Sequence, residues 1–163
     1  MPAPTEDPED AEFLRVCGPY LDHPRSWTDN ARLAPARIGA ALRAIARADE
    51  AVLVHCAGGR DRTGMISAMV LHIAGATDEA IIEDYATGWR GAGTYSGHGW
   101  VYDPDGETWR RNRHEPTEAD VLDRQVADRV PALREWIATF DGAAFLEAAD
   151  ILAIRSRLTP GGA

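Results

Sequence analysis

The sequence predicts an α/β fold that is rich in helices and built around a short strand at residues 51–55. The run Val52-Leu53-Val54 is apolar and rich in β-branched residues, and a glycine-containing loop follows it. This pattern is typical of a buried strand. Apolar residues on both sides of this unit repeat at helical spacing. With 163 residues, of which 45% are hydrophobic, the chain is long enough to bury one core.

The first part of the chain predicts a tail, a short element and a helix. Residues 1–12 are acidic and predict a disordered tail, and residues 13–163 form the predicted single domain. Residues 13–17 fit a short strand or a loop. Apolar residues then repeat at helical spacing from Ala34 onward, with Pro35 at a place that only the first turn of a helix tolerates.

After the strand and its loop, the pattern becomes helical again. Residues 63–74 are apolar on nearly all sides, which predicts a central, buried helix ended by Gly75. Thr77 is the predicted N-cap of the next helix. Residues 88–116 lack periodicity and are rich in Gly, Trp and charge, so we expect a long lid-like loop there. A capping signal at Thr117 predicts a long helix that an internal proline should kink or divide, and one or two short helices follow it.

Composition limits the classes of partner and location. The chain holds 17 Lys and Arg against 26 Asp and Glu, a net charge of −9, which argues against nucleic acid as a partner. No apolar run has the length of a membrane span, so we expect no stable membrane insertion, and the acidic start is unlike a signal peptide. Two cysteines form no disulfide framework. We therefore expect a cytoplasmic location, with export that needs no signal peptide as an open alternative.

The residues that carry chemistry lie directly after the predicted strand. The loop consists of Cys56, Ala57, Gly58, Gly59, Arg60, Asp61 and Arg62. Because its glycines lack Cβ atoms, such a loop can turn backbone N–H groups inward around an oxyanion, just before a helix N-terminus at Arg62 or Thr63. Helix N-termini and cations lower a thiol pKa from about 8.5 to roughly 3.5–7.5, which makes Cys56 a candidate nucleophile. Arg62 can hold two phosphoryl oxygens with its planar fork.

Three flanking residues are candidates to support the loop. The Thr63 hydroxyl can donate to the sulfur, Gly64 allows close packing beneath the loop, and a ring N–H of His55 can fix the loop.

The order Cys-x5-Arg-Thr-Gly, after an apolar run that ends in His, resembles the signature loop of protein tyrosine phosphatases. More narrowly, residues 56–64 are similar to the Cys-x-x-Gly-Lys-Asp-Arg-Thr-Gly loop of bacterial tyrosine phosphatases that also accept phosphoinositides, with Arg60 in place of Lys. The resemblance implies hydrolysis of a phosphotyrosine protein, a phosphoinositide or a small phosphate monoester through a cysteinyl-phosphate, with phosphate bound by residues 57–62. No metal and no organic cofactor are expected.

The resemblance also implies a central, mostly parallel sheet, but only residues 51–55 predict a strand. Relatives of this subfamily carry further strands and an acidic loop before the region that matches Tyr20. The chain is then a short member, has lost an N-terminal segment, or has its sheet completed by a second copy, as a homodimer or through strand exchange. An unpaired buried strand edge is costly, which is why a partner enters the argument.

The general acid that protonates the leaving oxygen has two candidates. Asp61 adjoins Arg62 in the loop, where the resembled subfamily keeps an aspartate, and it is the preferred assignment. Asp22 lies in the upstream stretch where most tyrosine phosphatases carry this residue.

Two functions from other classes stay open. The first is a catalytically silent phosphate-binding module on a truncated N-terminal scaffold. The second is a sulfurtransferase, which also places an activated cysteine in an anion-binding loop after a strand, although the Asp-Arg-Thr-Gly ending favours phosphate.

Overall fold

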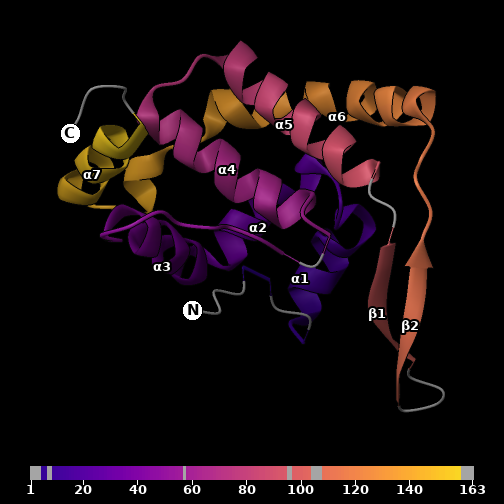
Figure 1. Cartoon of the computed structure of the whole chain (residues 1–163). Coiled ribbons are helices and arrows are strands. Elements are labelled where there is room, and N and C mark those ends of the chain that lie inside the picture. The colour runs from indigo at the N-terminus through magenta and orange to yellow at the C-terminus, as the bar shows by residue number, and fades with distance from the viewer. Residues whose placement is uncertain (1–4, 7–8, 57, 95–96, 104–107, 159–163) are drawn as a thin grey trace.

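The computed structural model describes residues 5–6, 9–56, 58–94, 97–103 and 108–158, and these residues form mainly helices (Figure 1). The elements are α1 (Ala11–Val16), α2 (Trp27–Leu33), α3 (Pro35–Ala46), α4 (Asp61–Ala74), α5 (Asp78–Gly93), β1 (Gly97–Asp103), β2 (Thr108–His114), α6 (Ala119–Thr139) and α7 (Ala148–Leu158), with short 3-10 helices at Gly18–Tyr20, Pro24–Ser26 and Gly142–Ala144. Within the described ranges, no helix is both long and apolar enough to cross a lipid bilayer.

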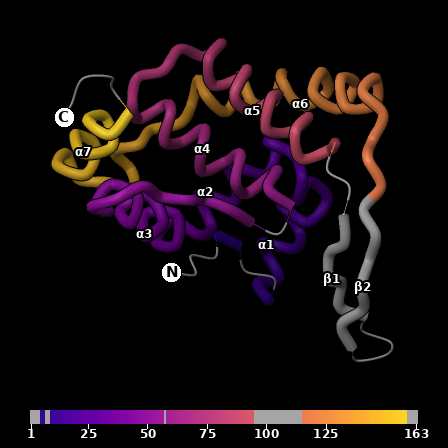
Figure 2. The backbone as a smooth tube through the Cα atoms, viewed as in Figure 1, coloured from indigo at the N-terminus to yellow at the C-terminus, as the bar shows by residue number. Residues whose placement is uncertain are grey.

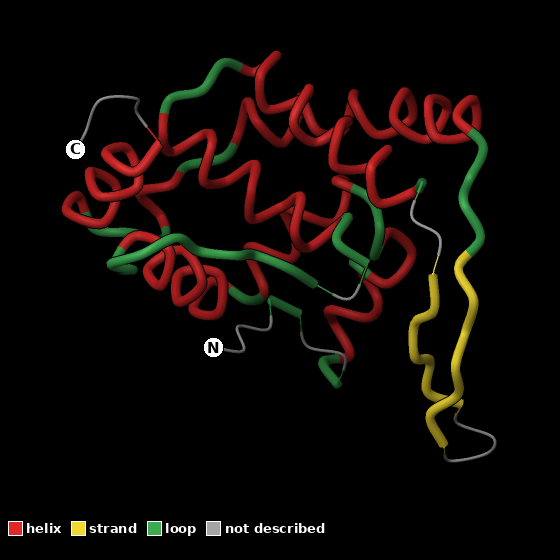
Figure 3. Tube along the Cα trace, viewed as in Figure 1, coloured by secondary structure: helices red, strands yellow, loops and turns green. Residues whose placement is uncertain are grey.

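The predicted α/β fold with a parallel sheet around residues 51–55 is wrong. In the described part of the chain, the sheet consists of β1 and β2, which pair antiparallel with Gly97 opposite His114 and Asp103 opposite Thr108. Residues 51–56 form no strand, and Figure 3 shows them as a stretched loop between α3 and α4.

The exposure of this segment gives the physical reason. Leu53 is 86% exposed and Val52 is 42% exposed, while Val54 packs against the core. An apolar, β-branched run favours an extended backbone, but a strand also needs a neighbour to accept its backbone hydrogen bonds. The described sheet does not include this segment. The segment is therefore an extended loop that leaves part of its apolar surface exposed to solvent. Dimerisation through it stays a prediction.

Two other local expectations are also corrected. Residues 13–17 lie in and just after α1, not in a strand or loop, because Asp10 caps this helix by accepting a hydrogen bond from the Phe13 N–H at 2.9 Å. Residues 88–116 hold the end of α5 and the two strands instead of one long loop, with 95–96 and 104–107 outside the described residues. A lid role for this segment stays a prediction.

Most of the helical expectations are confirmed. Pro35 is the first residue of α3, and the Thr77 hydroxyl caps α5 by accepting from the Ala80 N–H.

The long helix α6 differs from the expectation at its start and at its proline. It starts at Ala119, without a side-chain cap, and continues through Pro131 as one helix.

Helix α4 runs through the middle of the fold and positions the loop before it (Figures 1 and 2). It contacts α5 and α7 and buries Met65 and Met69 completely. Gly75 ends it with a positive φ of 87°, a conformation that glycine adopts without strain. The central, buried helix was predicted, but it begins at Asp61, inside the loop.

A cluster of buried aromatic rings lies beneath the start of α4. Trp27 of α2 packs edge-on against Tyr85 of α5, with ring centroids 5.6 Å apart, and against Trp136 of α6 at 5.2 Å. Gly64, in the first turn of α4, lies directly on the Tyr85 ring. The start of α4 therefore packs against a cluster of aromatic rings from α2, α5 and α6.

Replacing Gly64 with alanine tests this contact. A Cβ at position 64 would lie 3.0 Å from two ring carbons of the buried Tyr85, so Gly64→Ala is expected to lower the free energy of unfolding by about 1–3 kcal/mol. Gly88 on the exposed side of α5 has open space around it, and Gly88→Ala should raise the same quantity by about 0.5–1 kcal/mol. Urea denaturation measures both variants, and a neutral Gly64→Ala would contradict the close packing.

Candidate active site

The loop between residues 56 and 61 bends sharply and leads into a helix N-terminus. Gly58, Gly59 and Arg60 form a bend, and Gly59 has a φ of 66°, in the left-handed region that favours glycine. Helix α4 starts immediately afterwards, with its first backbone hydrogen bond from the Gly64 N–H to the Arg60 carbonyl at 2.8 Å. The preceding N–H groups of this helix have no partner within the helix and carry its positive dipole end. Ala57 lies outside the described residues.

Cys56 is partly buried beside this helix start. Burial raises the pKa of its thiol, but Thr63 and the N–H groups of Gly59 and Gly58 lower it by more, so the pKa lies below the usual 9.0. The buried Thr63 hydroxyl has no hydrogen-bond partner among the described atoms. A thiolate at Cys56 would give this buried donor an acceptor, which favours the ionised, nucleophilic form.

Arg62 lies in the first turn of α4 and is 42% exposed at its side chain. Its Nε lies 3.5 Å from Oε2 of Glu6. Burial raises the pKa of Glu6, and Arg62 opposes that rise. The sequence predicted a disordered tail over residues 1–12, yet Thr5 is buried and Glu6 reaches the signature arginine.

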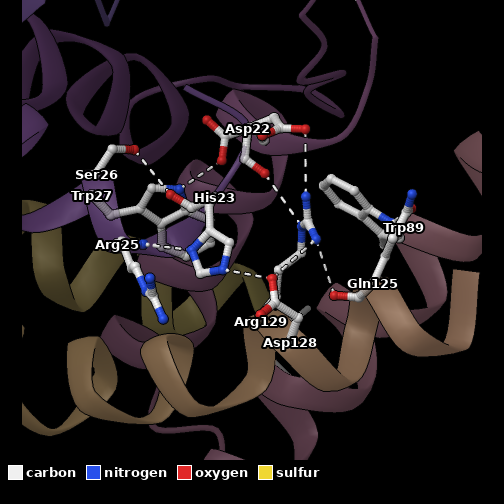
Figure 4. A network of polar contacts seen from close by, with 10 residues as sticks. Asp22, His23, Arg25, Ser26, Trp27, Trp89, Gln125, Asp128 and Arg129 are labelled. Carbon is white, nitrogen blue, oxygen red and sulfur yellow. Dashed lines mark hydrogen bonds and ion pairs between the residues drawn. The ribbon is translucent and has the colours of Figure 1, made fainter. Parts of the chain in front are cut away.

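Arg60 is held at the rim of the loop by an aromatic ring. Its Cζ lies 5.0 Å from the ring centroid of Trp89 in α5, within the range of a cation–π interaction. Arg129 of α6 contacts the same ring at 3.9 Å. The Trp89 indole is fixed in turn by a 2.9 Å hydrogen bond from its Nε1 to Gln125 (Figure 4).

Asp61 is the acidic residue of the loop, and its surroundings shift its pKa. It is buried at the first position of α4, and its Oδ1 accepts a 2.9 Å hydrogen bond from the indole N–H of Trp27. Burial raises the pKa of Asp61 to about 7, against the effect of the Trp27 hydrogen bond. At neutral pH this carboxyl group is thus divided between its protonated and ionised forms, as a group that donates and then accepts a proton requires.

Asp22, the alternative acid, lies on the same side of the molecule but in a different environment. Figure 4 shows it beside Arg129, whose Nη2 lies 3.4 Å from the Asp22 carboxylate and whose Nε donates to the Asp22 carbonyl at 3.3 Å. The Asp22 side chain is 69% exposed. Its charge contributes to the raised pKa of Asp61, so the structure brings the two acid candidates near each other.

Comparisons with known proteins point to one family. A profile of the tyrosine phosphatase family matches residues 9–142, which is most of the chain. The chain belongs to the tyrosine phosphatase family. A curated relative, a tyrosine-protein phosphatase of Nostoc commune, is 46% identical over 44 residues. This match covers 27% of the chain and 15% of that protein. No solved structure matches the chain significantly.

The loop residues are contiguous in the sequence, but sequence reasoning missed the distant residues that contact them. Trp27, Trp89 and Arg129 come from α2, α5 and α6, and no motif spacing connects them to the loop. A buried tryptophan needs an acceptor for its N–H, which is the one signal that could have pointed to Trp27. His55 is exposed, so its fixing of the loop stays a prediction.

Removing the Thr63 hydroxyl tests the electrostatics of Cys56 without an activity assay. Thr63→Val keeps the side-chain shape but removes a donor that lowers the Cys56 pKa, so alkylation of Cys56 by iodoacetamide at neutral pH should slow by about tenfold. Thr63→Ser keeps the hydroxyl and should react like the unmodified protein. If Thr63→Val is alkylated as fast as Thr63→Ser, the hydroxyl does not stabilise the thiolate.

Proposed function

We propose that this protein hydrolyses phosphate monoesters through a covalent cysteinyl-phosphate at Cys56. The observation that carries this proposal is the pairing, at one helix start, of a thiol with a lowered pKa and a buried carboxyl group with a raised pKa. The lowered pKa of the thiol favours the ionised nucleophile, and the raised pKa of the carboxyl group keeps the acid protonated to higher pH. Displacement of a poor leaving group needs both.

The proposed reaction has two steps. The Cys56 thiolate attacks phosphorus, and the bond from phosphorus to the ester oxygen breaks as Asp61 protonates that oxygen. Backbone N–H groups of the loop and the planar fork of Arg62 hold the other phosphoryl oxygens as their charge shifts. A water molecule then attacks phosphorus, gives a proton to the Asp61 carboxylate and releases phosphate, which restores the thiolate.

Burial favours Asp61 over Asp22 as the general acid. The Asp22 side chain is 69% exposed, and its carboxylate lies 3.4 Å from Nη2 of Arg129. Asp61 is buried next to the nucleophile loop and retains its proton up to about pH 7.

The proposed substrates are a phosphotyrosine protein, a phosphoinositide or a smaller phosphate monoester. The net charge of −9 gives no long-range attraction for such anions, so binding would depend on the helix start and on Arg60 and Arg62. The guanidinium of Arg60, anchored on Trp89 at the rim, suits a substrate with negative charge beyond the reacting phosphate.

Phosphate release from p-nitrophenyl phosphate tests the proposed activity. The unmodified protein should release phosphate, and Cys56→Ser should lose at least about a thousandfold in kcat/KM, since an unactivated hydroxyl is a much weaker nucleophile. If both proteins are inert while tungstate still binds, the chain is a silent phosphate-binding module. Transfer of sulfur from thiosulfate to cyanide, without phosphate release, would instead identify a sulfurtransferase.

The pH dependence of kcat/KM with phenyl phosphate tests the role of Asp61. Because the acid must be protonated, the rate should fall as pH rises through about 7, the raised pKa of Asp61. Asp61→Asn should remove this falling limb and lower the rate by roughly 10²–10⁴-fold. Asp22→Asn is the matched control and should keep the limb. Loss of the limb in Asp22→Asn alone would reverse the assignment.

A further inference from the structure

The contact between Trp27 and Asp61 influences which oxygen of the Asp61 carboxyl group carries the proton. Trp27 is fully buried, and it lies 34 residues before Asp61 in the chain, on a different helix. Its Nε1–H donates to Asp61 Oδ1 at 2.9 Å. An indole nitrogen can only donate, so Oδ1 must act as an acceptor whether Asp61 is ionised or protonated. Because the carbonyl oxygen of a neutral carboxyl group is the better acceptor, this bond favours the proton on Oδ2.

We propose that Trp27 is a positioning residue for the reaction, which fixes Asp61 Oδ1 and thereby presents Oδ2 as the oxygen that delivers the proton to the leaving group. This inference rests on the proposed function. It assigns a catalytic consequence to a tryptophan that lies outside the signature loop.

The indole is held firmly enough for this task. Its ring packs edge-on against Tyr85 at an interplanar angle of 79° and against Trp136 at 88°. The Tyr85 ring in turn packs closely against Gly64 of α4. A donor locked by packing orients its acceptor without losing side-chain entropy in each catalytic cycle.

The charged groups that face Asp61 come from several segments. Glu6 of the N-terminal segment and Asp22 before α2 disfavour its ionised form, whereas Arg62 of α4 favours it. Burial raises the pKa of Tyr85 of α5, and the nearby charge of Asp61 adds to that rise. Within this set, the Trp27 N–H stabilises the carboxylate directly. Its removal leaves burial, Glu6 and Asp22 to hold the proton on Asp61 to higher pH.

The test replaces Trp27 with phenylalanine, which keeps an aromatic ring in the cluster and removes the N–H. We expect the falling limb of kcat/KM to move up by about one pH unit. We also expect kcat with phenyl phosphate to fall about tenfold to a hundredfold, because the carboxyl group is no longer oriented. With p-nitrophenyl phosphate, whose leaving group needs less protonation, the loss should be much smaller.

Trp136→Phe is the matched control. It removes an indole from the same cluster but has no contact with Asp61 among the described interactions, so it should keep the limb at the pH of the unmodified protein. If Trp27→Phe also leaves the limb in place, while Asp61→Asn removes it, the proposed function stands and the positioning role is overturned. If the unmodified protein shows no phosphate release that depends on Cys56, both fail.

A second measurement uses the unmodified protein, in case Trp27→Phe does not fold. The ¹H–¹⁵N signal of the Trp27 indole should shift with pH as its acceptor titrates, with a midpoint near the Asp61 pKa of about 7. This shift should vanish in Asp61→Asn. An indole signal that does not change between pH 5 and 9 would show that the bond does not respond to the proton and would overturn the inference.

Discussion

One hydrogen bond, from the buried indole of Trp27 to the buried carboxyl group of Asp61, joins the signature loop to the helical core. On one side, Asp61 is the first residue of α4, whose N-terminus carries the loop. On the other side, the Trp27 ring of α2 packs against Tyr85 of α5 and Trp136 of α6. Packing between these three helices therefore fixes the position of the indole. A buried carboxyl group without a partner would be costly. The same bond therefore stabilises the fold around the loop and sets the chemistry of the group it holds.

The electrostatics of the site are local. The chain as a whole is acidic, with a net charge of −9, yet the loop gathers Arg60 and Arg62 and the positive end of a helix dipole. Glu6 lies within this cluster, where burial raises its pKa and Arg62 opposes that rise. An oxyanion is thus attracted only once it is at the loop.

The sequence predicted the loop and most helices because their signals are local. Cys56 through Gly64 are contiguous, and the helical expectations for α3 to α5 followed from Pro35, Gly75 and Thr77 at their ends. The sheet was mispredicted because an apolar run such as Val52–Val54 specifies an extended backbone but not its neighbours. The role of Glu6 was missed because it lies in an acidic segment, and that of Trp27 because it is far from the loop in the sequence. Strand β1 was missed because its sequence contains glycines. For Glu6 and Trp27, a contact between distant parts of the chain decides the outcome.

The central claim is that Cys56 carries the phosphoryl group between the two steps. Rapid acid quench of the protein during turnover of a phosphate monoester, followed by digestion and mass spectrometry, tests it directly. The account predicts one added phosphoryl group on the peptide that contains Cys56, accumulating further in Asp61→Asn with p-nitrophenyl phosphate, because activation of the second-step water is then lost. Phosphate release with no modified cysteine at any time would contradict the account.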